Sequence, residues 1–568
     1  MTHAITLAAT SPTACSPPTG INVARRLTVT AAQMPDALAV VVPRGRDSSG
    51  KRRYDKFTFR QLDDDSARIA AGLAAWGVEP GMRIALLVRP GFEFISLVFA
   101  LFKAGAVIVL IDPGMGRKNL IRCLSDAQPD GFIAIPLVQA IRKLLGPRFP
   151  RARFNVTVGR RLFWDGLTLD ELRARGTPGP ICHDTSADDA AAIIFTTGST
   201  GPPKGVLYRH GNFDRQVSEL AEFYGIRPGE IDLPGFPLFG LFNCALGVTT
   251  VIPDMDPSRP ARVDPRKIVE AIHDWNVTQA FGSPAIWNRV GPYCQQHNVA
   301  LPSLRRVLCA GAPVPPHVLA RMKSCIAPDG DVHTPYGATE ALPVASIAAS
   351  EVLAETQHRW AQGGGTCVGR KFPGIEWKVI GIVDGPIAKL SDAIELPSGQ
   401  IGELIVTGPV VTREYVTRTE ANALAKIANG HRTWHRMGDV GYLDKQGRFW
   451  FCGRLAHRVQ TARGTLFTIP CEAIFNQHPD IYRSALVGVG PAGNQRPVIV
   501  AEPWPGRMPR GRAARQKLLA ELAEQARGNA LTADIRDFFL HPSLPVDVRH
   551  NAKIFREQLA LWAAARLR

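Results

Sequence analysis

Residues 191–205 read Ala-Ala-Ile-Ile-Phe-Thr-Thr-Gly-Ser-Thr-Gly-Pro-Pro-Lys-Gly. The run from Ala191 to Phe195 is apolar throughout, which is typical of a strand buried in a parallel sheet. The glycines that follow let backbone N–H groups approach an anion, the hydroxyls donate further hydrogen bonds, and Lys204 adds a compact positive charge. Lys204 lies between Pro203 and Gly205, so the loop lacks the Walker A pattern. We therefore predict a polyphosphate-binding loop and ATP chemistry, outside the P-loop NTPases.

The chain of 568 residues is too long for one hydrophobic core, and its 45% hydrophobic content is ample for burial. At least two domains are expected. The longest apolar stretch, Ile95 to Ile111, is interrupted by Lys103 and Gly105 and is too short to span a bilayer untilted. We interpret it as a buried helix followed by a buried strand.

The first 20 residues are rich in Thr, Ser, Pro and Ala and lack the basic and apolar regions of a signal peptide, so we expect a disordered tail. The ten cysteines include no Cys-x-x-Cys pair, and no His/Cys cluster has zinc-ligand spacing. This pattern suits free thiols in a reducing compartment and predicts a cytoplasmic protein.

The net charge of +17 is compatible with nucleic acid, an anionic membrane surface or acidic small molecules and partners. Residues 507–517 contain five Arg or Lys and no acid, but Pro and Gly interrupt the first half and aromatic side chains for base stacking are absent. We expect a solvated face or a partner contact there, and no nucleic acid.

Helices and strands alternate from Thr58 onward. Thr58 and Gln61 form a capping box for a helix that Gly77 can close. Apolar strands are expected at Arg83–Val88 and 107–111, on either side of a helix around Phe94–Phe102. This order is typical of a parallel sheet covered by helices on both faces.

A second α/β unit follows the phosphate loop. Its expected strands are Val248–Ile252, Thr278–Phe281 and Arg306–Cys309, and Asp264 caps a helix between the first two. Past Asp384 the apolar runs are shorter and separated by turns, which predicts antiparallel strands in a barrel-like section before a separate C-terminal domain.

Three further motifs carry polar side chains suited to a nucleotide. Tyr336-Gly337-Ala338-Thr339-Glu340 follows an expected strand at 331–334 and offers an aromatic face, a hydroxyl and a carboxylate for Mg²⁺. Asp439 stands after Gly438 on what reads as a tight turn, and Gly453-Arg454 follows fourteen residues later. Arg549-His550-Asn551-Ala552-Lys553-Ile554 lies near the end of the chain. Each motif alone has an ordinary structural explanation, but the order of all of them is specific.

In this order the motifs resemble the adenylate-forming superfamily of acyl-CoA synthetases, luciferases and peptide-synthetase adenylation domains, over nearly the whole chain. The resemblance implies an α/β fold. A large N-terminal domain, 21–453, would hold two α/β subdomains plus the barrel-like section and bind ATP and the acyl group. A small mobile α+β domain, 454–568, would carry the catalytic lysine.

The resemblance also implies roles for single residues. Tyr336 and Gly337 would hold the adenine, Thr339 the α-phosphate, and Glu340 the Mg²⁺. Lys553 would be catalytic with Thr339 and Glu340, because its charge offsets repulsion between carboxylate and phosphate. The other nucleotide-binding residues implied are Thr196, Thr197, Gly198, Ser199, Thr200, Gly201 and Lys204 for the pyrophosphate end, Gly311, Ala312 and Pro313 for the adenine pocket, and Asp439 and Arg454 for the ribose.

An apolar, aromatic set lies where this superfamily places its acyl pocket, and simple core is an equally good explanation for it. Its members are Phe236, Phe239, Phe242, Phe281, Pro284 and Trp287.

Most superfamily members transfer the acyl group to a thiol after adenylation, and this chain differs from them in the segments that serve that second step. The hinge position, usually charged, is Ala456, and residues 457–464 lack the usual glycine pair. This variant hinge and the residues at 251–257, 435–439 and 550–553 resemble those of the olefin β-lactone synthetases.

That resemblance implies a long-chain 2-alkyl-3-hydroxy acid as substrate, ATP and Mg²⁺ as cofactors, and attack of the substrate's own 3-hydroxyl on the acyl adenylate to give a β-lactone, AMP and diphosphate. It also implies assembly with a reductase and a decarboxylase of olefin biosynthesis. The alternatives are a fatty acyl-CoA synthetase, a fatty acyl-AMP ligase and an inactive nucleotide-binding scaffold.

Overall fold

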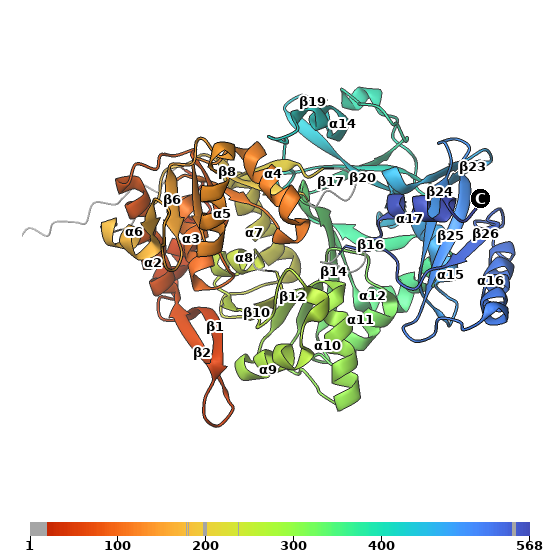
Figure 1. The fold of residues 1–568 in the computed structure, drawn as a ribbon, viewed down its shortest axis with the longest axis horizontal. Coiled ribbons are helices and arrows are strands. Elements are labelled where there is room, and N and C mark those ends of the chain that lie inside the picture. Colours follow the sequence, from red (N-terminus) through yellow and green to blue (C-terminus); the bar gives the residue numbers. More distant parts are fainter. Residues whose placement is uncertain are drawn as a thin grey trace, which may run out of the picture.

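The computed structural model describes residues 20–177, 179, 181–196, 202–236, 238–547 and 553–567. Nearly all of the tail predicted at 1–20 lies outside these residues. Figure 1 shows three bodies: an α/β unit at the left, a second unit through the lower centre to the top, and a smaller C-terminal unit at the right. The predicted fold class, two α/β subdomains with an antiparallel section and a small α+β C-terminal domain, is confirmed.

The first α/β unit contains a seven-stranded sheet in the order β7-β6-β5-β3-β4-β8-β9. All neighbours are parallel except β8 and β9, which form an antiparallel pair around the predicted phosphate loop. The strands are β3 (Arg83–Leu87), β4 (Val107–Leu110), β5 (Gly131–Ala134), β6 (Phe154–Thr157), β7 (Leu167–Thr168), β8 (Ala190–Phe195) and β9 (Gly205–Arg209), and the helices are α2 (Phe59–Ala75), α3 (Phe92–Lys103), α4 (Arg117–Ala127), α5 (Pro136–Leu144), α6 (Leu169–Arg175) and α7 (His210–Tyr224).

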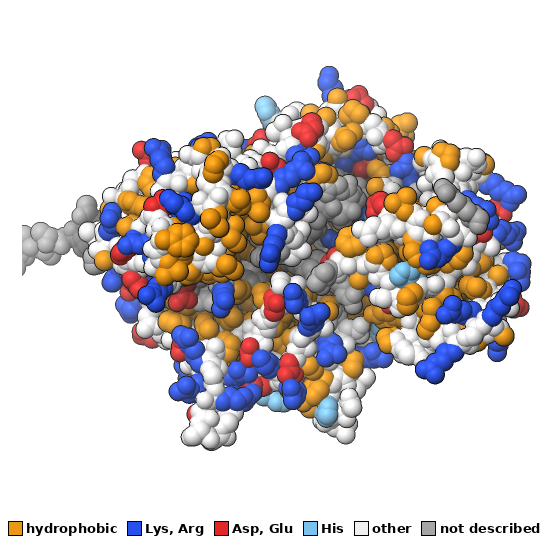
Figure 2. Space-filling model, in the orientation of Figure 1, with side chains coloured by type: hydrophobic (Ala, Val, Ile, Leu, Met, Phe, Trp, Pro, Cys, Tyr) orange, Lys and Arg blue, Asp and Glu red, His pale blue; other side chains and the backbone are white. Residues whose placement is uncertain are grey.

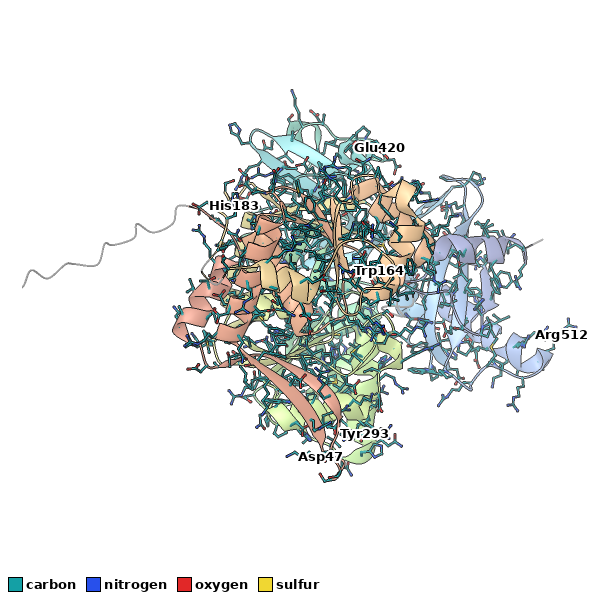
Figure 3. All side chains as sticks on the ribbon, turned by 60° about the vertical axis from the view of Figure 1, so that its left-hand side comes forward. Asp47, Trp164, His183, Tyr293, Glu420 and Arg512 are labelled. Carbon is teal, nitrogen blue, oxygen red and sulfur yellow. The ribbon has the colours of Figure 1, made fainter. Side chains whose placement is uncertain are left out.

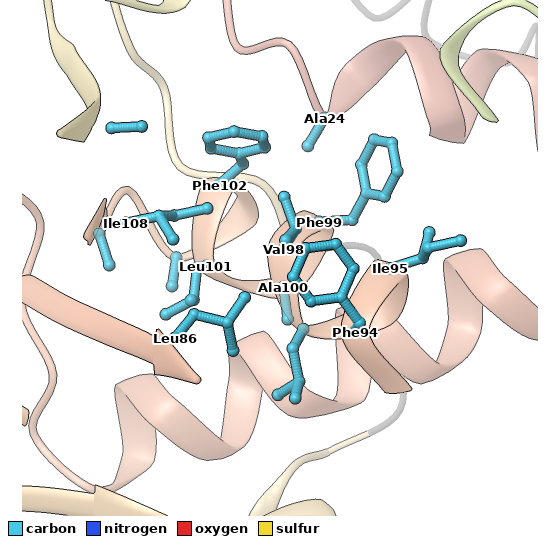
Figure 4. Packing of buried hydrophobic residues seen from close by; sticks show 14 of the residues in the cluster. Ala24, Leu86, Phe94, Ile95, Val98, Phe99, Ala100, Leu101, Phe102 and Ile108 are labelled. Carbon is cyan, nitrogen blue, oxygen red and sulfur yellow. The ribbon is translucent and has the colours of Figure 1, made fainter. Parts of the chain in front are cut away.

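The core of this unit surrounds α3. Every residue of α3 except Glu93 is buried, and Figure 4 shows its Phe, Ile, Val and Leu side chains packed together with neighbours such as Ala24 and Leu86. Lys103 at the end of the helix is also buried and donates to Asp63 at 2.6 Å. The prediction of a buried helix followed by a buried strand between Ile95 and Ile111 is confirmed. The Thr58–Gln61 capping box at the start of α2 is present.

The second unit contains a fourteen-stranded sheet. Its middle strands β10 to β14 are parallel where they pair, with β11 also pairing β1 in parallel. The strands are β10 (Ile231–Pro234), β11 (Thr249–Val251), β12 (Gln279–Gly282), β13 (Arg306–Cys309) and β14 (Asp331–Ala338), and the helices are α8 (Phe239–Ala245), α9 (Pro265–Trp275), α10 (Pro284–His297), α11 (Pro316–Lys323), α12 (Ala349–Glu351) and α13 (Gln357–Ala361).

The antiparallel section expected beyond residue 384 is the open continuation of this sheet, joined through β15 and β16. The segments before residue 58, for which the sequence predicts no element, form a helix that packs against α2 and α8 and a hairpin at the opposite end of the sheet. The continuation is β15 (Ala341–Ala348), β16 (Thr366–Lys371), β17 (Glu376–Ile380), β18 (Gly402–Thr407), β19 (Lys426–Asn429), β20 (Arg432–Leu443) and β21 (Phe449–Arg454) with α14 (Asn422–Ala425), and the early elements are α1 (Arg25–Gln33), β1 (Leu38–Arg46) and β2 (Arg52–Thr58).

The C-terminal unit has its own three-stranded sheet, in the order β24-β25-β26, and a separate hairpin of β22 and β23. Its core is also its own, with Phe475, Leu486, Ile499 and Leu522 buried together. The elements are β22 (Val459–Thr461), β23 (Gly464–Leu466), α15 (Thr468–Phe475), β24 (Ile481–Val489), β25 (Arg496–Pro503), α16 (Arg512–Arg527), β26 (Asp537–Leu540) and α17 (Arg556–Ala564).

Candidate active site

Three segments from different parts of the chain meet beside the end of the phosphate loop. Tyr208 on β9 donates a hydrogen bond of 2.6 Å to the carbonyl of Thr339, in the turn between β14 and β15. The backbone N–H of Thr412 donates to the carbonyl of Glu340 at 2.9 Å, and Val416 donates to Gly205 at the same distance. These bonds hold Thr339 and Glu340 next to the loop, as predicted from their order in the sequence.

The two ends of the loop are hydrogen-bonded to each other. Thr196 donates its backbone N–H to the carbonyl of Lys204 at 3.0 Å, and the N–H of Lys204 donates to the Thr196 hydroxyl at 3.2 Å. Gly205 donates to the hydroxyl of Thr417 at 2.8 Å. The loop is therefore closed at its base. Five residues predicted to bind phosphate lie outside the described part of the chain, and they are Thr197, Gly198, Ser199, Thr200 and Gly201.

The carboxylate of Glu340 belongs to a cluster of polar and charged side chains, of which the sequence motifs predict only Glu340 and Lys204. Tyr415 donates a hydrogen bond of 2.6 Å to Glu340 Oε1. Lys204 Nζ lies 4.7 Å from the centre of the Tyr415 ring, and Lys426 Nζ lies 5.6 Å from it. Burial and the nearby carboxylate raise the pKa of Tyr415, so the hydroxyl stays a donor at neutral pH.

Lys426 is the first residue of β19 and is partly buried, with Nζ 2.5 Å from the carbonyl of Thr412. Burial lowers its pKa to about 8; the charge of Glu340 opposes that shift and the charge of Lys204 adds to it. Tyr415 and Lys426 carry no spacing signal in the sequence, because the fold alone brings them to Glu340. Together with Lys204 they give the site two cations around one carboxylate.

Asp439 pairs directly with Arg454 across β20 and β21. Its Oδ1 lies 2.9 Å from Arg454 Nη1, and Tyr336 donates its hydroxyl to Oδ2. Burial raises the pKa of Asp439, while the charge of Arg454 and the hydrogen bond from Tyr336 lower it. The residues predicted to hold adenine and ribose are thus in mutual contact.

The expectation that Asp439 stands on a tight glycine turn is wrong. It lies inside the twelve-residue strand β20, where the register against β18 shifts between Glu403 and Ile405. Gly438 has a φ of 63°, a conformation that favours glycine. An irregularity of this kind changes the direction of one side chain in the strand. It needs a glycine before Asp439, as a tight turn would, so the Gly-Asp motif alone does not distinguish the two.

Both oxygens of the Asp439 carboxylate have a partner, Oδ1 the Arg454 guanidinium and Oδ2 the Tyr336 hydroxyl. A carboxylate oxygen can accept more than one hydrogen bond, so the pair retains acceptor capacity for ribose hydroxyls. The backbone of Gly337 packs closely against Ala341, since a Cβ on Gly337 would lie 2.6 Å from the Ala341 carbonyl.

Gly311, Ala312 and Pro313, predicted to line the adenine pocket, begin two residues after the end of β13. Because β13 and β14 are parallel, their carboxyl ends lie at one edge of the sheet, so this segment is near Tyr336 at the end of β14. Gly311 has a φ of 99°.

Lys553 belongs to the C-terminal unit. Its backbone N–H donates to the Asp547 carboxylate at 2.9 Å, and its carbonyl accepts from the Asp547 N–H at 3.0 Å. Its positive charge contributes to lowering the pKa of Asp439, less than the charge of Arg454 does. The catalytic role of Lys553 stays a prediction.

The predicted acyl-binding set divides between two places. Phe239, Phe242 and Phe281 line a cavity of ≈ 30 Å³, and Phe236 packs against the same core cluster. The cavity has room for about two water molecules, so a long alkyl chain requires these aromatic rings to move. Pro284 begins α10 and Trp287 is buried in a different cluster, which also contains Ala280 on the other face of β12. The side chain of Trp287 is core and does not reach this cavity.

The segment with the unusual hinge connects the fourteen-stranded sheet of the second unit with the smaller C-terminal unit. Ala456 is exposed in a short turn, 455–457, directly after β21. His457 Nε2 lies 3.3 Å from Glu557, and burial lowers the pKa of this histidine to about 4. Arg458 pairs with Asp384 of the large domain at 2.5 Å. The hairpin that follows, β22 and β23, turns at 462–463.

Comparisons with known proteins agree with this geometry. The family model for AMP-binding enzymes matches residues 27–416. The olefin β-lactone synthetase of Stenotrophomonas maltophilia is 48% identical over 554 residues, which covers 96% of this chain and 98% of that protein. The olefin β-lactone synthetase of Xanthomonas campestris is also 48% identical, over 96% and 97% of the two chains.

Among solved structures, the amide bond synthetase McbA from Marinactinospora thermotolerans superposes with a TM-score of 0.76 at 21% identity, covering 95% of this chain and 99% of that one. The o-succinylbenzoate-CoA synthetase of Bacillus subtilis, solved with an acyl-adenylate, gives 0.72 at 21% identity, over 94% and 97%. These similarities concern the fold. The chain belongs to the AMP-binding enzymes, and within that family to the olefin β-lactone synthetases.

Proposed function

We propose that this enzyme adenylates a long-chain 2-alkyl-3-hydroxy fatty acid and closes it to a β-lactone, in the biosynthesis of long-chain olefins. The observation that carries the proposal is the charge arrangement around Tyr415. It combines one carboxylate and two lysines, and the same domain holds a buried aspartate, Asp439, paired with Arg454. Such a site would hold a triphosphate at one end and a ribose at the other.

In the first step a carboxylate oxygen of the acid attacks the α-phosphorus of ATP, and the bond to diphosphate breaks. Two anions must approach each other, so cations are needed near the reacting atoms. Lys204 and Lys426 supply two cations from the large domain, and Lys553 would supply a third from the C-terminal unit. Lys553 would lie nearest the carboxylate and the α-phosphate, and Thr339 would bind the α-phosphate.

Glu340 would hold Mg²⁺, which supplies positive charge to the phosphate oxygens when bound. The described residues contain no group of three or more His, Cys, Asp or Glu that could hold a metal ion. A single protein carboxylate agrees with magnesium chemistry, because Mg²⁺ is commonly held by one or two carboxylates together with substrate phosphates. Tyr415 orients the carboxylate for that role.

In the second step the 3-hydroxyl oxygen of the substrate attacks the acyl carbon, the bond to the AMP oxygen breaks, and the hydroxyl proton leaves with AMP or to solvent. An intramolecular nucleophile reacts at an effective concentration of roughly 10⁵ M or more when it is oriented. A site closed against water protects the adenylate from hydrolysis. The aromatic cavity at Phe239 and Phe281, lined mainly by apolar side chains, supports such a site for an apolar chain.

We further propose that residues 454–568 rotate as a unit about the segment at Ala456, and that residues 21–453 form the ATP- and acyl-binding domain. The support is topological. Strand β21 is the last strand of the large sheet along the chain and ends at Arg454, and among the described strands β22 pairs with β23 alone. The absence of the glycine pair after Ala456 favours a lactone over a thioester as product.

We place the enzyme in the cytoplasm, in an assembly with a decarboxylase and a reductase that handle the same long-chain substrates. The nine described cysteines are free thiols, which supports a reducing compartment. Among the described residues, no helix is both long and apolar enough to cross a bilayer.

The test is product analysis with purified enzyme, ATP, Mg²⁺ and a syn or anti 2-alkyl-3-hydroxy fatty acid, with and without coenzyme A. We expect AMP and a β-lactone in equal amounts, unchanged by coenzyme A. A thioester that forms only with coenzyme A would make the protein an acyl-CoA ligase. Accumulated acyl-AMP would make it an acyl-AMP ligase, and no AMP from any acid would indicate an inactive scaffold.

A further inference from the structure

Helix α5 has its apolar face outward. Leu137, Ile141 and Leu144 are 67%, 42% and 76% exposed, and their spacing puts them on one face of the helix. The opposite face buries a glutamine and an arginine, Gln139 and Arg142. An amphipathic helix of a monomeric protein normally has the reverse arrangement.

Hydrogen bonds stabilise this inverted orientation. Gln139 Nε2 donates to the carbonyls of Phe132 and Val156, at 3.1 and 2.8 Å. Arg142 donates to Gln139 Oε1 at 2.8 Å and to Asp165 at 3.0 Å. Buried polar groups are tolerated when they are paired in this way. The fold therefore anchors α5 by its polar side and leaves the apolar side to solvent.

The loop after β6 extends the apolar surface. Leu162 and Phe163 are 57% and 68% exposed. The loop lies against α5, because Asp165 contacts Arg142 and a Cβ on Gly159 would lie 3.5 Å from Pro136. Beneath it Trp164, labelled in Figure 3, is buried and donates to the Thr157 hydroxyl at 2.8 Å. We call this surface the α5 patch, and it consists of Leu137, Ile141, Leu144, Leu162 and Phe163.

Positive charge exceeds negative charge around the α5 patch. Residues 136–165 contain seven Arg or Lys and one acid, Asp165, which pairs with Arg142 and Lys143. Arg151 and Arg161 pair with Asp130 and Glu171. Arg148, Arg153 and Arg160 are exposed and form no ion pair with any described residue. Figure 2 shows orange and blue side chains together over the part of the surface where Figure 1 places α5.

We propose that the α5 patch docks this enzyme on an anionic phospholipid surface. Leu and Phe side chains that enter the headgroup region, together with Lys and Arg that attract acidic headgroups, make up a peripheral membrane site. A protein partner could cover the apolar side chains without cations around them, so the arginines near the α5 patch favour a lipid surface.

The position of α5 agrees with this role. Because β5 and β8 belong to the parallel part of one sheet, α5 starts at the same edge as the phosphate loop. Long-chain acids partition into membranes, so docking at this edge would bring the enzyme to its proposed substrate. The inference itself depends on the surface and not on the reaction.

The test is flotation of the full chain with vesicles of phosphatidylcholine alone or with 30 mol% phosphatidylglycerol, a composition of about one acidic lipid in three. We expect flotation with the acidic vesicles only, and loss of flotation at high salt. Replacing Leu137, Leu144 and Phe163 by Ser should lower the bound fraction at least about tenfold, as should Arg148, Arg153 and Arg160 to Glu. These side chains are exposed, so melting temperatures should stay at the wild-type value.

Two control variants separate the α5 patch from general properties of the chain. Ile394→Ser with Leu561→Ser removes two apolar side chains that are 75% exposed elsewhere. Replacement of Arg510, Arg512 and Arg515 by Glu changes the net charge by the same amount at the far end of the C-terminal unit, where Figure 3 labels Arg512. Both should float like wild type.

Equal loss of flotation in the second control would overturn the proposal, because net charge would then explain binding. Failure of the wild-type protein to float would also overturn it. So would a dimer in light scattering that the Ser variant converts to a monomer, because a second copy would then cover the α5 patch. Lactone formation from soluble short-chain acids is expected to be unchanged in all variants. This assay therefore distinguishes a failure of the proposed reaction from a failure of membrane docking.

Discussion

Tyr415 donates a hydrogen bond of 2.6 Å to the carboxylate of Glu340, a residue 75 positions earlier in the chain. The same aromatic ring lies within 6 Å of the ammonium groups of Lys204 and Lys426. A neutral hydroxyl thus orients the carboxylate, and the π face of the ring lies next to both cations. This residue connects the expected Mg²⁺ side of the site with its phosphate side.

Tyr415→Phe removes that hydrogen bond and keeps the ring. A hydrogen bond to a charged group contributes about 1.5–3 kcal/mol, and Glu340 is only partly buried, so we expect a weakening near the lower limit, about tenfold. The Mg²⁺ concentration needed for half-maximal ATP–diphosphate exchange should rise by that factor. Tyr442→Phe, which removes a hydrogen bond of 2.6 Å to Gly364 away from the site, is the matched control. An unchanged Mg²⁺ dependence of Tyr415→Phe would contradict the role.

Lys426 predicts a pH dependence of ATP binding. Its pKa is about 8 in the protein without ATP, so its positive charge is lost as the pH rises through that value. We expect kcat/KM for ATP to fall above pH 8 in the wild-type enzyme. In Lys426→Met this fall should disappear, with kcat/KM low at every pH. A fall of the same size in the variant would assign the titration to another group.

The same residue affects stability in the opposite direction. Its pKa in the folded protein is below its ordinary value of 10.5, so the unfolded chain binds more protons between about pH 8 and 10.5. Its contribution makes the free energy of unfolding rise with pH across this window. Urea unfolding at pH 8 and pH 10 should show that Lys426→Met lacks this part of the pH dependence.

Asp439→Asn keeps the shape of the side chain and removes its charge. Arg454 then lacks a charged partner in a site that is only partly open to solvent, and the ribose loses a charged acceptor. We expect ATP affinity to fall about tenfold or more, with a small decrease in melting temperature. Thermal unfolding with increasing ATP measures both, because the stabilisation by ligand reports the dissociation constant. Normal stabilisation of the variant by ATP would exclude Asp439 from the ribose site.

Lys553→Ala separates the two steps of the reaction. Since Lys553 is proposed to act when carboxylate and phosphate approach, its loss should lower adenylation by at least about a hundredfold. Conversion of synthetic acyl-AMP to lactone should be nearly unaffected, because no anion attacks an anion in that step. Equal loss in both assays would show that Lys553 acts on the lactonisation step as well.

The sequence predicted the parts of the fold that follow from local patterns. The capping box at Thr58 and the strand at 306–309 appear as expected, because they depend on neighbouring residues. The strand expected at 331–334 continues to Ala338, where its pairing with β15 stabilises residues that read as a loop. The predicted turn at Asp439 is wrong for a related reason, since a glycine within a bulged strand and a glycine in a turn give the same short motif.

The site was predictable only where a motif is contiguous. Thr339 and Glu340 were found through Tyr336, but Tyr415 and Lys426 were not, because no spacing rule relates them to Glu340. Trp287 shows the converse limit. Its aromatic character groups it with Phe281, yet α10 carries it to the other side of β12. The aromatic character of a side chain does not determine which face of a sheet it occupies.

The most direct measurement of the central claim is the fate of oxygen in a 2-alkyl-3-hydroxy acid labelled with ¹⁸O in both carboxylate oxygens. If the carboxylate is adenylated and the 3-hydroxyl then displaces AMP, mass spectrometry should show one ¹⁸O in the phosphate of AMP and one in the lactone carbonyl. A lactone that keeps both labels, with unlabelled AMP, would show that the hydroxyl had been activated instead and would contradict the account.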